Sequence, residues 1–497
     1  MRIRNLLALI IITYIIASEI YFSQKRRLQF LSSNDWAASL EPAIWERLSW
    51  NAIARAINLA VARTAQGSAR DRWVRKYGDW WGNSLQLGNE LARSPQQPLG
   101  RYVLREEWTN FIEFIEDSLQ IEAISPQGRF RGAGLVMAIG KSQRYAIPAL
   151  VTLRLLRALG CRLPVEVWYS SARGESPFTN GLEAALRRMN QVVDADDDQG
   201  EIPLYFRDLD ALVPWNRDLG GWASLFAIKP LSIAYSRFAQ VLYLDADAHP
   251  IRDPTYLFSF LPSRRLSQEN ASGIPTAIFW PDYWSMPANH PAFSIFRVAP
   301  QSSAQRREQE SSVVLVDKSS VHHSWVPLLL AVMLNVRSDY TYQYLHGDKD
   351  TFRFAWMALD IPFHRIEKDP AAAGYWSPDR TFQGTTMVQH DPNGEPLVLH
   401  QNLEKIDVCT LVRSTQHPSG RIWDAVQFGG QANWTTHGRW IGPKSRICLT
   451  GPRVQTKSIQ AYLQDDYEMR WFRPALEAVL ADPFGQRLRR WRHCMDT

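Results

Sequence analysis

Two aspartates at the end of an apolar run are the residues whose type and spacing point most directly to chemistry. Residues 238–244 are mostly apolar and lead into Asp245 and Asp247, which a single alanine separates. Two positions apart on a strand, both carboxylates would point to one face, and at a strand end they can converge on one cation. Carboxylate oxygens suit hard divalent ions, which in turn can bind diphosphate oxygens. The pair therefore predicts a metal–diphosphate site.

Alternating strands and helices are predicted to hold this pair at the edge of a sheet. Residues 129–140 indicate a strand bounded by glycines, residues 145–161 an amphipathic helix and residues 164–169 a second strand. A strand, a helix and a strand in succession form a βαβ unit, which requires parallel strands. The pattern continues to the strand that ends at Asp245. We predict an α/β fold with an open, mainly parallel sheet and flanking helices, whose ligands bind at the carboxyl ends of the strands.

The composition is that of an ordinary globular protein. The chain has 497 residues, of which 45% are hydrophobic and 21% charged, and its formal net charge is +6. The basic residues form no block that could follow a nucleic-acid backbone, so no nucleic-acid partner is expected. None of the four cysteines lies in a CxxC pair, which argues against a structural zinc site. Cys409 and Cys448 could pair in an oxidising compartment, and four free thiols are the alternative.

The amino-terminal residues predict a membrane anchor. Residues 6–22 are nearly all apolar, with Glu19 as the interruption, and basic residues flank both ends. This length is about sufficient to cross a thin bilayer. Residues 17–19 form a poor cleavage site, so an uncleaved anchor is favoured over a cleaved signal peptide. Glycosylation sequons at Asn270 and Asn433 agree with a lumenal location of the remaining chain.

Seven blocks between residues 128 and 410 resemble the fungal Golgi α-mannosyltransferases of the Mnn family. They occur in the order RGAGLVMAIG, LRLLRALGCRLPVEVWY, KPLSIAYSRFAQVLYLDADAHPIRDPTYLF, IFWPDYW, ESSVVLVDKSSVHHSW, GDKDTFRFAW and VLHQNLEK. The resemblance implies a GT-A-like fold, a type II Golgi membrane protein with a lumenal catalytic domain, GDP-mannose as donor and Mn²⁺ as metal. It also implies an α-linked product formed with retention of configuration. The linkage, α-1,2 or α-1,3, and the acceptor stay open.

The resemblance divides the chain into four predicted regions. Residues 1–27 are the cytoplasmic tip and transmembrane anchor, and residues 28–125 are a stem with helices that lead into the next domain. Residues 126–450 are the GT-A-like catalytic domain, and residues 451–497 are a C-terminal helical extension. Within the catalytic domain, the polar segment 300–312 is predicted to be a loop.

The donor and metal site is predicted from four of the matched positions. Asp245 and Asp247 match the metal and diphosphate ligands of the family, and Lys229, on the preceding helix, could meet a phosphate. The alternative for Lys229 is a solvated helix residue. His400 lies where such folds commonly supply a third metal ligand, and His390 competes for that role.

Three carboxylates and one tryptophan are the candidates for the sugars. Trp280 and Asp282 match a block that faces the donor or acceptor sugar, although a core tryptophan and a turn-capping aspartate are the alternatives. Glu310 matches an acidic residue before the next strand, and Asp348 could bind an acceptor hydroxyl or cap the following helix. The family often has Gly-Gln where this chain has Ser at residues 311–312, which puts acceptor contacts there in doubt.

We therefore expect a metal-dependent, retaining α-mannosyltransferase that acts on a mannoside of a glycoprotein or cell-wall glycan. The acceptor would attack from the face that the nucleoside diphosphate leaves. A carboxylate nucleophile is the other route to retention, with Asp282, Glu310 and Asp348 as candidates. A transferase of the same fold with another sugar nucleotide is one alternative function. A catalytically silent scaffold in a Golgi glycosyltransferase complex is another.

Overall fold

The fold is described from a computed structural model of the chain. It covers residues 130–139, 145–171, 181–191, 202–209, 228–261, 275–290, 292–293, 307–318, 326–336, 341–342, 344–358, 361–415, 417–434 and 446–490. The predicted anchor and stem lie outside these ranges. None of the helices inside them is long and apolar enough to cross a membrane.

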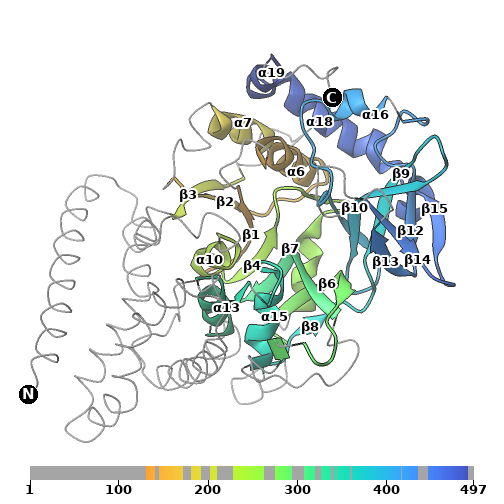
Figure 1. The fold of residues 1–497 in the computed structure, drawn as a ribbon. Helices are drawn as coiled ribbons and strands as arrows, with labels where there is room; N and C mark the ends of the chain where they lie inside the picture. Colours follow the sequence, from red (N-terminus) through yellow and green to blue (C-terminus); the bar gives the residue numbers. More distant parts are fainter. Residues whose placement is uncertain are drawn as a thin grey trace, which may run out of the picture. The chain divides into compact units, whose positions relative to one another are not determined.

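The first of two sheets has seven strands in the order β3-β2-β1-β4-β7-β6-β8 (Figure 1). These are β1 (Ala133–Ala138), β2 (Val165–Tyr169), β3 (Leu204–Asp208), β4 (Gln240–Leu244), β6 (Ala277–Ser285), β7 (Arg307–Asp317) and β8 (His364–Arg365). Strands β1 to β4 are parallel, as the alternating pattern predicts. β7 runs antiparallel to both β4 and β6, so the sheet is mixed and its parallel part is largely this first half.

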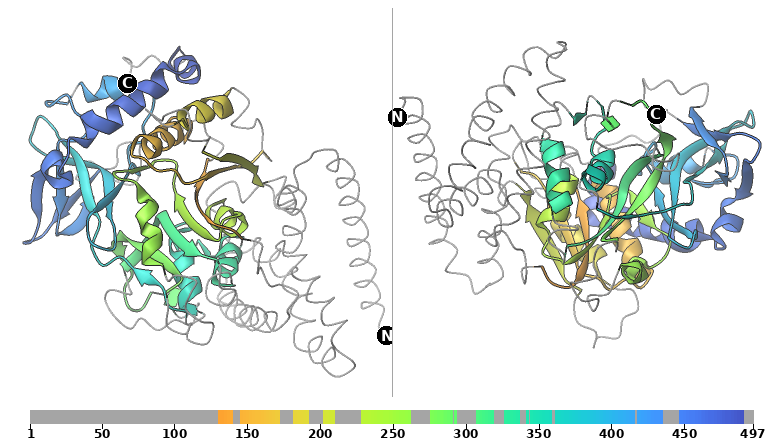
Figure 2. Two further views of the ribbon diagram at one scale, coloured as in Figure 1. Left: turned by 180° about the vertical axis from the view of Figure 1, so that it is seen from behind. Right: turned by 90° about the horizontal axis from the view of Figure 1, so that it is seen from below.

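Helices flank the first sheet (Figure 2). They are α6 (Ala146–Ala158), α7 (Leu182–Met189), α10 (Ile228–Tyr235), α13 (Val326–Val336) and α15 (Lys349–Ala358). α6 and α7 pack on each other on one side, and α10 contacts β1, β2 and β4 on the other. Because both faces are covered, all six residues of β1 are small or apolar and four consecutive residues of β4 are apolar, without alternation. The α/β fold with flanking helices is confirmed.

The carboxyl end of α10 is fixed by a buried lysine from the neighbouring strand. Nζ of Lys318, which follows β7, donates to the carbonyl oxygens of Ile233 at 2.9 Å and Ser236 at 2.6 Å. A cation at a helix C-terminus satisfies carbonyls that have no partner inside the helix. This contact fixes the helix whose first turn carries Lys229.

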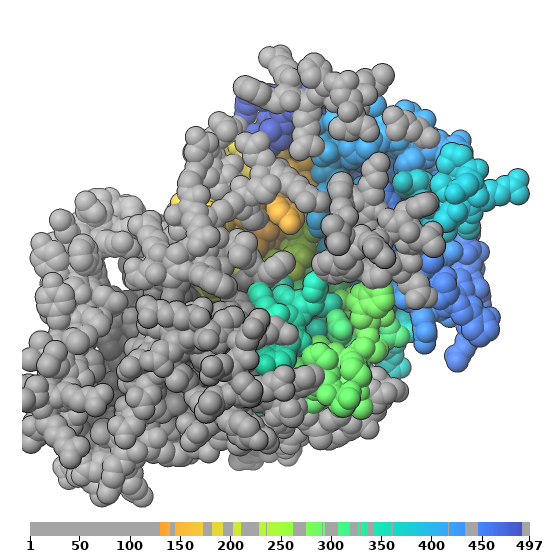
Figure 3. Space-filling view, viewed as in Figure 1, coloured from red at the N-terminus to blue at the C-terminus, as the bar shows by residue number. Residues whose placement is uncertain are grey.

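A second sheet, wholly antiparallel, was not predicted. Its strands are β5 (Ala248–Pro250), β9 (Ala371–Trp376), β10 (Phe382–His390), β11 (Pro396–His400), β12 (Ala425–Phe428), β13 (Gln431–Trp434), β14 (Ile447–Thr450) and β15 (Gln455–Ser458). Its main order is β13-β14-β10-β9-β12-β15, with β11 pairing β10 and β5. The strands of this sheet lie on the right of the ribbon and the space-filling view (Figures 1 and 3).

Short helices follow the strands of the second sheet. They are the 3₁₀ helix η4 (Pro254–Phe260), α16 (Thr410–Ser414), α17 (Ile459–Leu463), the π-helical turn η7 (Glu468–Phe472), α18 (Arg473–Ala481) and α19 (Pro483–Arg490). α18 packs on α6, so nearly all residues of α6 are buried. The C-terminal region beyond residue 450 thus holds helices and one strand, and the predicted domain boundaries stay a prediction.

Two further expectations need correction. Residues 307–312, predicted as part of a loop, are the first half of β7. Their polar side chains misled the prediction because several of them are buried in a charged network. Cys448 is a free thiol and Cys409 is disulfide-bonded, so the Cys409–Cys448 pair considered from the sequence is wrong.

Candidate metal and diphosphate site

The predicted aspartate pair lies in the turn that joins the two sheets. β4 ends at Leu244, and the amide of Asp245 donates to the carbonyl of Ser312 on β7 at 2.8 Å. The amide of Ala248 then donates to the carbonyl of Asp245 at 3.0 Å, which closes a turn and starts β5 in the second sheet. The pair follows β4, which is the last of the four adjacent parallel strands and lies in the middle of the sheet. Sheets of this kind bind ligands at the carboxyl ends of such strands.

Pairing between β5 and β11 brings a histidine to the aspartates. His400, the last residue of β11, lies opposite Ala248 in the antiparallel register. Its Nε2 is 3.5 Å from Oδ1 of Asp247 and 4.0 Å from Oδ2 of Asp245. One ligand atom from each of the three residues lies within 4.8 Å of the others. Asp245, Asp247 and His400 are called the metal cluster below.

The donor atoms of the metal cluster fit a divalent ion. Carboxylate oxygens and an imidazole nitrogen suit Mn²⁺ and similar ions. Nδ1 of His400 is buried without a hydrogen bond, and Oε1 of Glu310 lies 3.5 Å from it. A carboxylate beside the second ring nitrogen of a metal-binding histidine orients the ring and raises its basicity. Glu310, a predicted catalytic residue, is therefore placed to support His400.

Two lysines approach the aspartates from different elements. Nζ of Lys229 on α10 lies 2.8 Å from Oδ2 of Asp245 and 3.0 Å from Oγ of Ser311. Lys405, five residues after His400, contacts the carboxylate of Asp247. Lys405 was not singled out from the sequence, although it closes the block VLHQNLEK. A lysine close behind the histidine of that block is the signal that could have found it.

The aspartates and the lysines around the metal cluster stabilise one another's charged forms. Burial opposes ionisation of Asp247, but Lys405 and His400 outweigh it and lower the pKa of its carboxyl group. Burial likewise opposes the charge of Lys229, and Asp245 and nearby carboxylates overcome it and raise the pKa of the ammonium. Both groups are charged at neutral pH, so the site combines ligands for a cation with ammonium groups for an anion.

A tyrosine and the backbone hold the aspartates in place. The hydroxyl of Tyr243 donates to Oδ1 of Asp245 at 2.8 Å. Burial first, and then the nearby carboxylates, raise the pKa of this hydroxyl well above its usual value, which keeps it protonated. The amide of Gln401 donates to the carbonyl of Asp247 at 3.0 Å. The metal cluster is therefore positioned before any ligand binds.

The two serines that depart from the family pattern hold the other predicted carboxylates. Oγ of Ser311 donates to Oδ2 of Asp348 at 2.8 Å, and the amide of Ser312 donates to Oε2 of Glu310 at 2.9 Å. Asp348 also lies 3.6 Å from the Lys229 ammonium. Burial raises the pKa of Asp348 to about 6, although Lys229 opposes this shift. Glu310 and Asp348 thus border the metal cluster.

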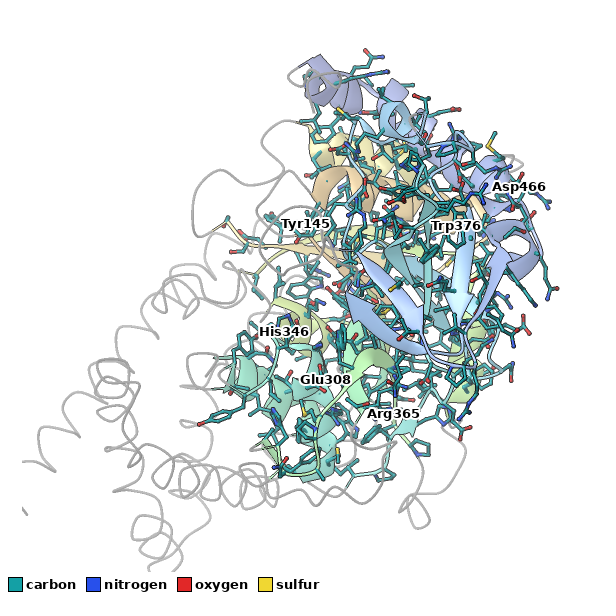
Figure 4. All side chains as sticks on the ribbon, turned by 45° about the vertical axis from the view of Figure 1, so that its right-hand side comes forward. Tyr145, Glu308, His346, Arg365, Trp376 and Asp466 are labelled. Carbon is teal, nitrogen blue, oxygen red and sulfur yellow. The ribbon has the colours of Figure 1, made fainter. Side chains whose placement is uncertain are left out.

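Asp282 belongs to a different charged group. Nζ of Lys349 lies 2.5 Å from Oδ2 of Asp282 and 2.8 Å from Oε2 of Glu308. These three residues, called the lysine cluster, join β6, β7 and α15. In Figure 4, Glu308 lies low in the view, and Trp376 of the second sheet lies well above it. The carboxylate of Asp282 thus pairs with Lys349, and its role in catalysis stays a prediction.

Trp280 and His390 are structural. Trp280 is fully buried, and its Nε1 donates to the carbonyl of His390 at 2.7 Å. A side chain without exposed surface cannot contact a sugar, so the predicted sugar contact of Trp280 is replaced by a core role. Nε2 of His390 shares a hydrogen bond with the hydroxyl of Tyr462 at 2.7 Å, and burial lowers the pKa of the ring to about 3. Of the two histidines considered, His400 is the one beside the aspartates.

Taken as a class, this is an α/β protein with a carboxylate–imidazole cluster between two sheets. The sequence profile of the family described as "Mannosyltransferase putative" matches residues 132–308 and 301–391, just over half of the chain. The chain belongs to this family, and the resemblance to fungal Mnn-type mannosyltransferases is confirmed.

Individual relatives are fungal proteins. The alpha-1,2-mannosyltransferase MNN21 of Candida albicans is 24% identical over 332 residues, which are 56% of this chain and 46% of the relative. MNN5 of Saccharomyces cerevisiae is 24% identical over 344 residues, 58% of this chain and 54% of the relative. The chain spans about half the length of the curated relatives it matches.

Solved structures are similar only at a distance. Mouse xyloside xylosyltransferase 1 aligns with a TM-score of 0.30 and 16% identity, over 47% of this chain and 85% of the other. The Mn/GDP form of core-mannan synthase A from Aspergillus fumigatus aligns with a TM-score of 0.29 and 8% identity, over 47% and 71%. TM-scores this low support no conclusion about the function of the protein.

Proposed function

We propose that the protein transfers mannose from GDP-mannose to a mannoside of a glycoprotein or cell-wall glycan, with Mn²⁺ and with retention of configuration. The observation that carries the proposal is the metal cluster, Asp245, Asp247 and His400, with a lysine beside each aspartate. Family membership supports mannosyl transfer. The relatives named above are alpha-1,2-mannosyltransferases, which favours an α-1,2 over an α-1,3 linkage.

The residues in and around the metal cluster would have two roles, metal binding and neutralisation of the diphosphate. Asp245, Asp247 and His400 would hold the divalent ion, which offsets charge on the departing diphosphate. Lys229 and Lys405 would neutralise phosphate oxygens, because their ammonium groups already lie at the two ends of the aspartate pair. Both lysines act on charge that grows as the bond between sugar and phosphate breaks, so they stabilise the transition state more than the bound substrate.

The neighbouring carboxylates would position these groups. Glu310 would orient His400, and Asp348, 3.6 Å from the ammonium, would help to hold Lys229. The acceptor oxygen would form its bond to the anomeric carbon as the bond to the phosphate breaks, on the same face of the sugar. Its proton would leave with the phosphate. This route needs no covalent intermediate, and neither carboxylate has to act as a nucleophile.

The proposed setting follows the family resemblance. An anchor at residues 6–22 would make the protein a single-pass type II Golgi membrane protein with the described domain in the lumen. Its partners would be the sugar nucleotide, the acceptor glycan and, in the membrane, other glycosyltransferases of a Golgi complex. Microscopy of a tagged full-length chain tests the location.

Replacement of Asp247 tests the reaction. Asp247→Asn should abolish Mn²⁺-dependent hydrolysis of GDP-mannose and mannosyl transfer, because it removes one ligand charge and leaves the side-chain shape. Asp466→Asn is the matched control, since Asp466 is a partly exposed carboxylate that pairs with Arg421 at 2.7 Å. Full activity of Asp247→Asn, with a normal melting temperature, would rule out the metal assignment.

A thermal-shift screen tests the donor. GDP-mannose with Mn²⁺ should raise the melting temperature, whereas UDP-glucose, UDP-galactose and UDP-N-acetylglucosamine should not, because a ligand stabilises only the state that binds it. A larger shift with a UDP-sugar would point to a transferase with another donor. No shift with any of them would favour a silent scaffold.

A further inference from the structure

Two buried polar side chains outside the metal cluster lie beside the turn that carries its aspartates. Thr152 is in the middle of α6, whose other residues are apolar or arginine, and His249 is in β5, two residues after Asp247. Both side chains are fully buried. Burial of a hydroxyl or an imidazole costs free energy unless hydrogen bonds replace the contacts with water. The hydrogen bonds of these two residues therefore indicate what they do.

Thr152 connects α6 to residues 245–248, called the aspartate turn below. Its Oγ1 lies 2.8 Å from the carbonyl oxygen of Ala246, the residue between the two aspartates, and 2.8 Å from Nδ1 of His249. A carbonyl only accepts, so the single proton of the hydroxyl goes to Ala246. Nδ1 of His249 must then carry a proton and donate it to Oγ1. The ring thereby holds the hydroxyl in the orientation that binds the turn.

The His249 ring is not part of the metal cluster. Ala248 lies opposite His400 in the register of β5 and β11, and His249 is the next residue along the strand. Since successive side chains of a strand point to opposite faces, the His249 ring lies on the face away from His400. There it contacts the ring of Phe472 edge to face, with the ring centres 5.3 Å apart. His249 can therefore act on a bound ion only through the aspartate turn.

Stability of the fold does not explain an imidazole at this position. In the tautomer described above Nε2 is an acceptor. The side chain of Gln401 also acts on the ring, but Nε2 is buried without a hydrogen bond within the described part of the chain. A buried acceptor without a donor lowers stability, whereas an apolar side chain of similar size has no such cost. The bond that Nδ1 gives to Thr152 is the contact that only a polar residue can make.

We propose that Thr152 and His249 are positioning residues of the metal cluster. Through the carbonyl of Ala246 they hold the aspartate turn in the conformation that brings both carboxylates beside His400. The inference rests on the proposed function for the identity of the ion, and it adds the part of the fold that sets the geometry of the ligands. Because the Ala246 peptide lies between the two aspartates, a shift of this peptide moves both of them.

The two residues have different shares in this support. Thr152 supplies the bond to the turn, and His249 sets its direction. Threonines inside helices often donate to the carbonyl four residues earlier, which is that of Pro148 in α6. Without the proton from His249, the hydroxyl of Thr152 would be able to rotate to that carbonyl. The aspartate turn would then lose its contact with α6.

Thr152→Val in the full-length protein tests the contact. Valine keeps the branched shape and removes the hydroxyl, so Mn²⁺ binding in the presence of GDP should weaken roughly three- to tenfold, the effect of one lost hydrogen bond. Thr152→Ser keeps the hydroxyl and should bind Mn²⁺ within about twofold of the unmodified protein. Calorimetric titration measures the affinities.

Thr386→Val is the matched control for this substitution. It removes a buried hydroxyl of the second sheet that accepts a hydrogen bond from Nε1 of Trp423 at 2.9 Å. The melting temperature should fall because the indole N–H loses its partner, and Mn²⁺ affinity should stay the same. A residue with a structural role alone gives this result, so a change in Mn²⁺ affinity separates positioning from stability.

His249→Leu is the second variant, and it replaces Thr152→Val if that protein does not fold. Mn²⁺ affinity should fall roughly threefold, whereas the melting temperature should not fall, because leucine leaves no buried acceptor without a donor. Unchanged Mn²⁺ affinity in the folded variants would overturn the inference. Weakened Mn²⁺ binding in the variants, with no mannosyl transfer by the unmodified protein, would contradict only the proposed function. Absence of Mn²⁺ binding by the unmodified protein would overturn both.

Discussion

The metal cluster and the lysine cluster are both buried groups of opposite charges, but their arrangements differ. In the lysine cluster, one ammonium lies between the carboxylates of Asp282 and Glu308. In the metal cluster, ligand atoms of two carboxylates and an imidazole lie within 4.8 Å of one another, and one lysine contacts each aspartate of the pair. The difference teaches that burial and charge alone do not identify a site. Convergence of ligand atoms on one point does, and variants in each cluster test this distinction.

The largest effect on stability is expected in the lysine cluster. Lys349→Met should lower the free energy of unfolding by about 3 kcal/mol, because it leaves two poorly exposed carboxylates without their cation. Mn²⁺ affinity should not change. Denaturant unfolding and calorimetric titration measure the two quantities, and Lys457→Met, on the exposed strand β15, is the control. A tenfold loss of Mn²⁺ affinity in Lys349→Met would mean that the two clusters act as one.

The largest effect on metal binding is expected at His400. His400→Ala should weaken Mn²⁺ binding at least about a hundredfold, more than the loss of a residue that only supports a ligand. Calorimetric titration with Mn²⁺ in the presence of GDP measures the change. His364→Ala serves as the control. If His400→Ala binds Mn²⁺ as tightly as the unmodified protein, the histidine is not a ligand.

A smaller effect is expected at Glu310. Glu310→Gln should weaken Mn²⁺ binding roughly tenfold, because the amide keeps the shape but loses the charge that orients His400. The same titration measures this, with Glu395→Gln, whose side chain is half exposed, for comparison. A loss of transfer at saturating Mn²⁺ without any loss of affinity would instead indicate that Glu310 acts directly in the reaction.

The smallest effect is expected at Trp280. Trp280→Phe should lower the free energy of unfolding by about 1 kcal/mol, since the carbonyl of His390 loses a hydrogen bond. The KM values for donor and acceptor should not change. Denaturant unfolding and steady-state kinetics test both statements. A raised KM for either sugar substrate would support the contact between Trp280 and a sugar that the sequence suggested.

The parallel half of the first sheet could be predicted because its short, mostly apolar strands alternate along the chain with helices. The second sheet could not. Gly374 and Gly384 are paired inside β9 and β10, where a Cβ would lie 2.0 Å from the carbonyl oxygen of Gln383 and 2.2 Å from that of Ile447. Glycine in a sequence favours the prediction of a turn, whereas here it permits close packing of three strands.

The site was predicted where residue type and position agreed. Asp245, Asp247 and His400 each lie at or just beyond a strand end, and the structure brings all three together. For Trp280, the match to a family block left a sugar contact and a core role open, and only the burial of the side chain decides for the core. Lys405 was missed because it lies in an irregular segment after β11, where the sequence has no periodic pattern.

Because the turn between β4 and β5 connects the two sheets, the metal cluster contains residues of both. Asp245 follows a strand of the first sheet, and His400 ends a strand of the second. Any displacement of one sheet against the other therefore changes the distances between the ligand atoms. An ion bound by residues of both sheets would cross-link them. Its affinity would therefore depend on how the two sheets are aligned.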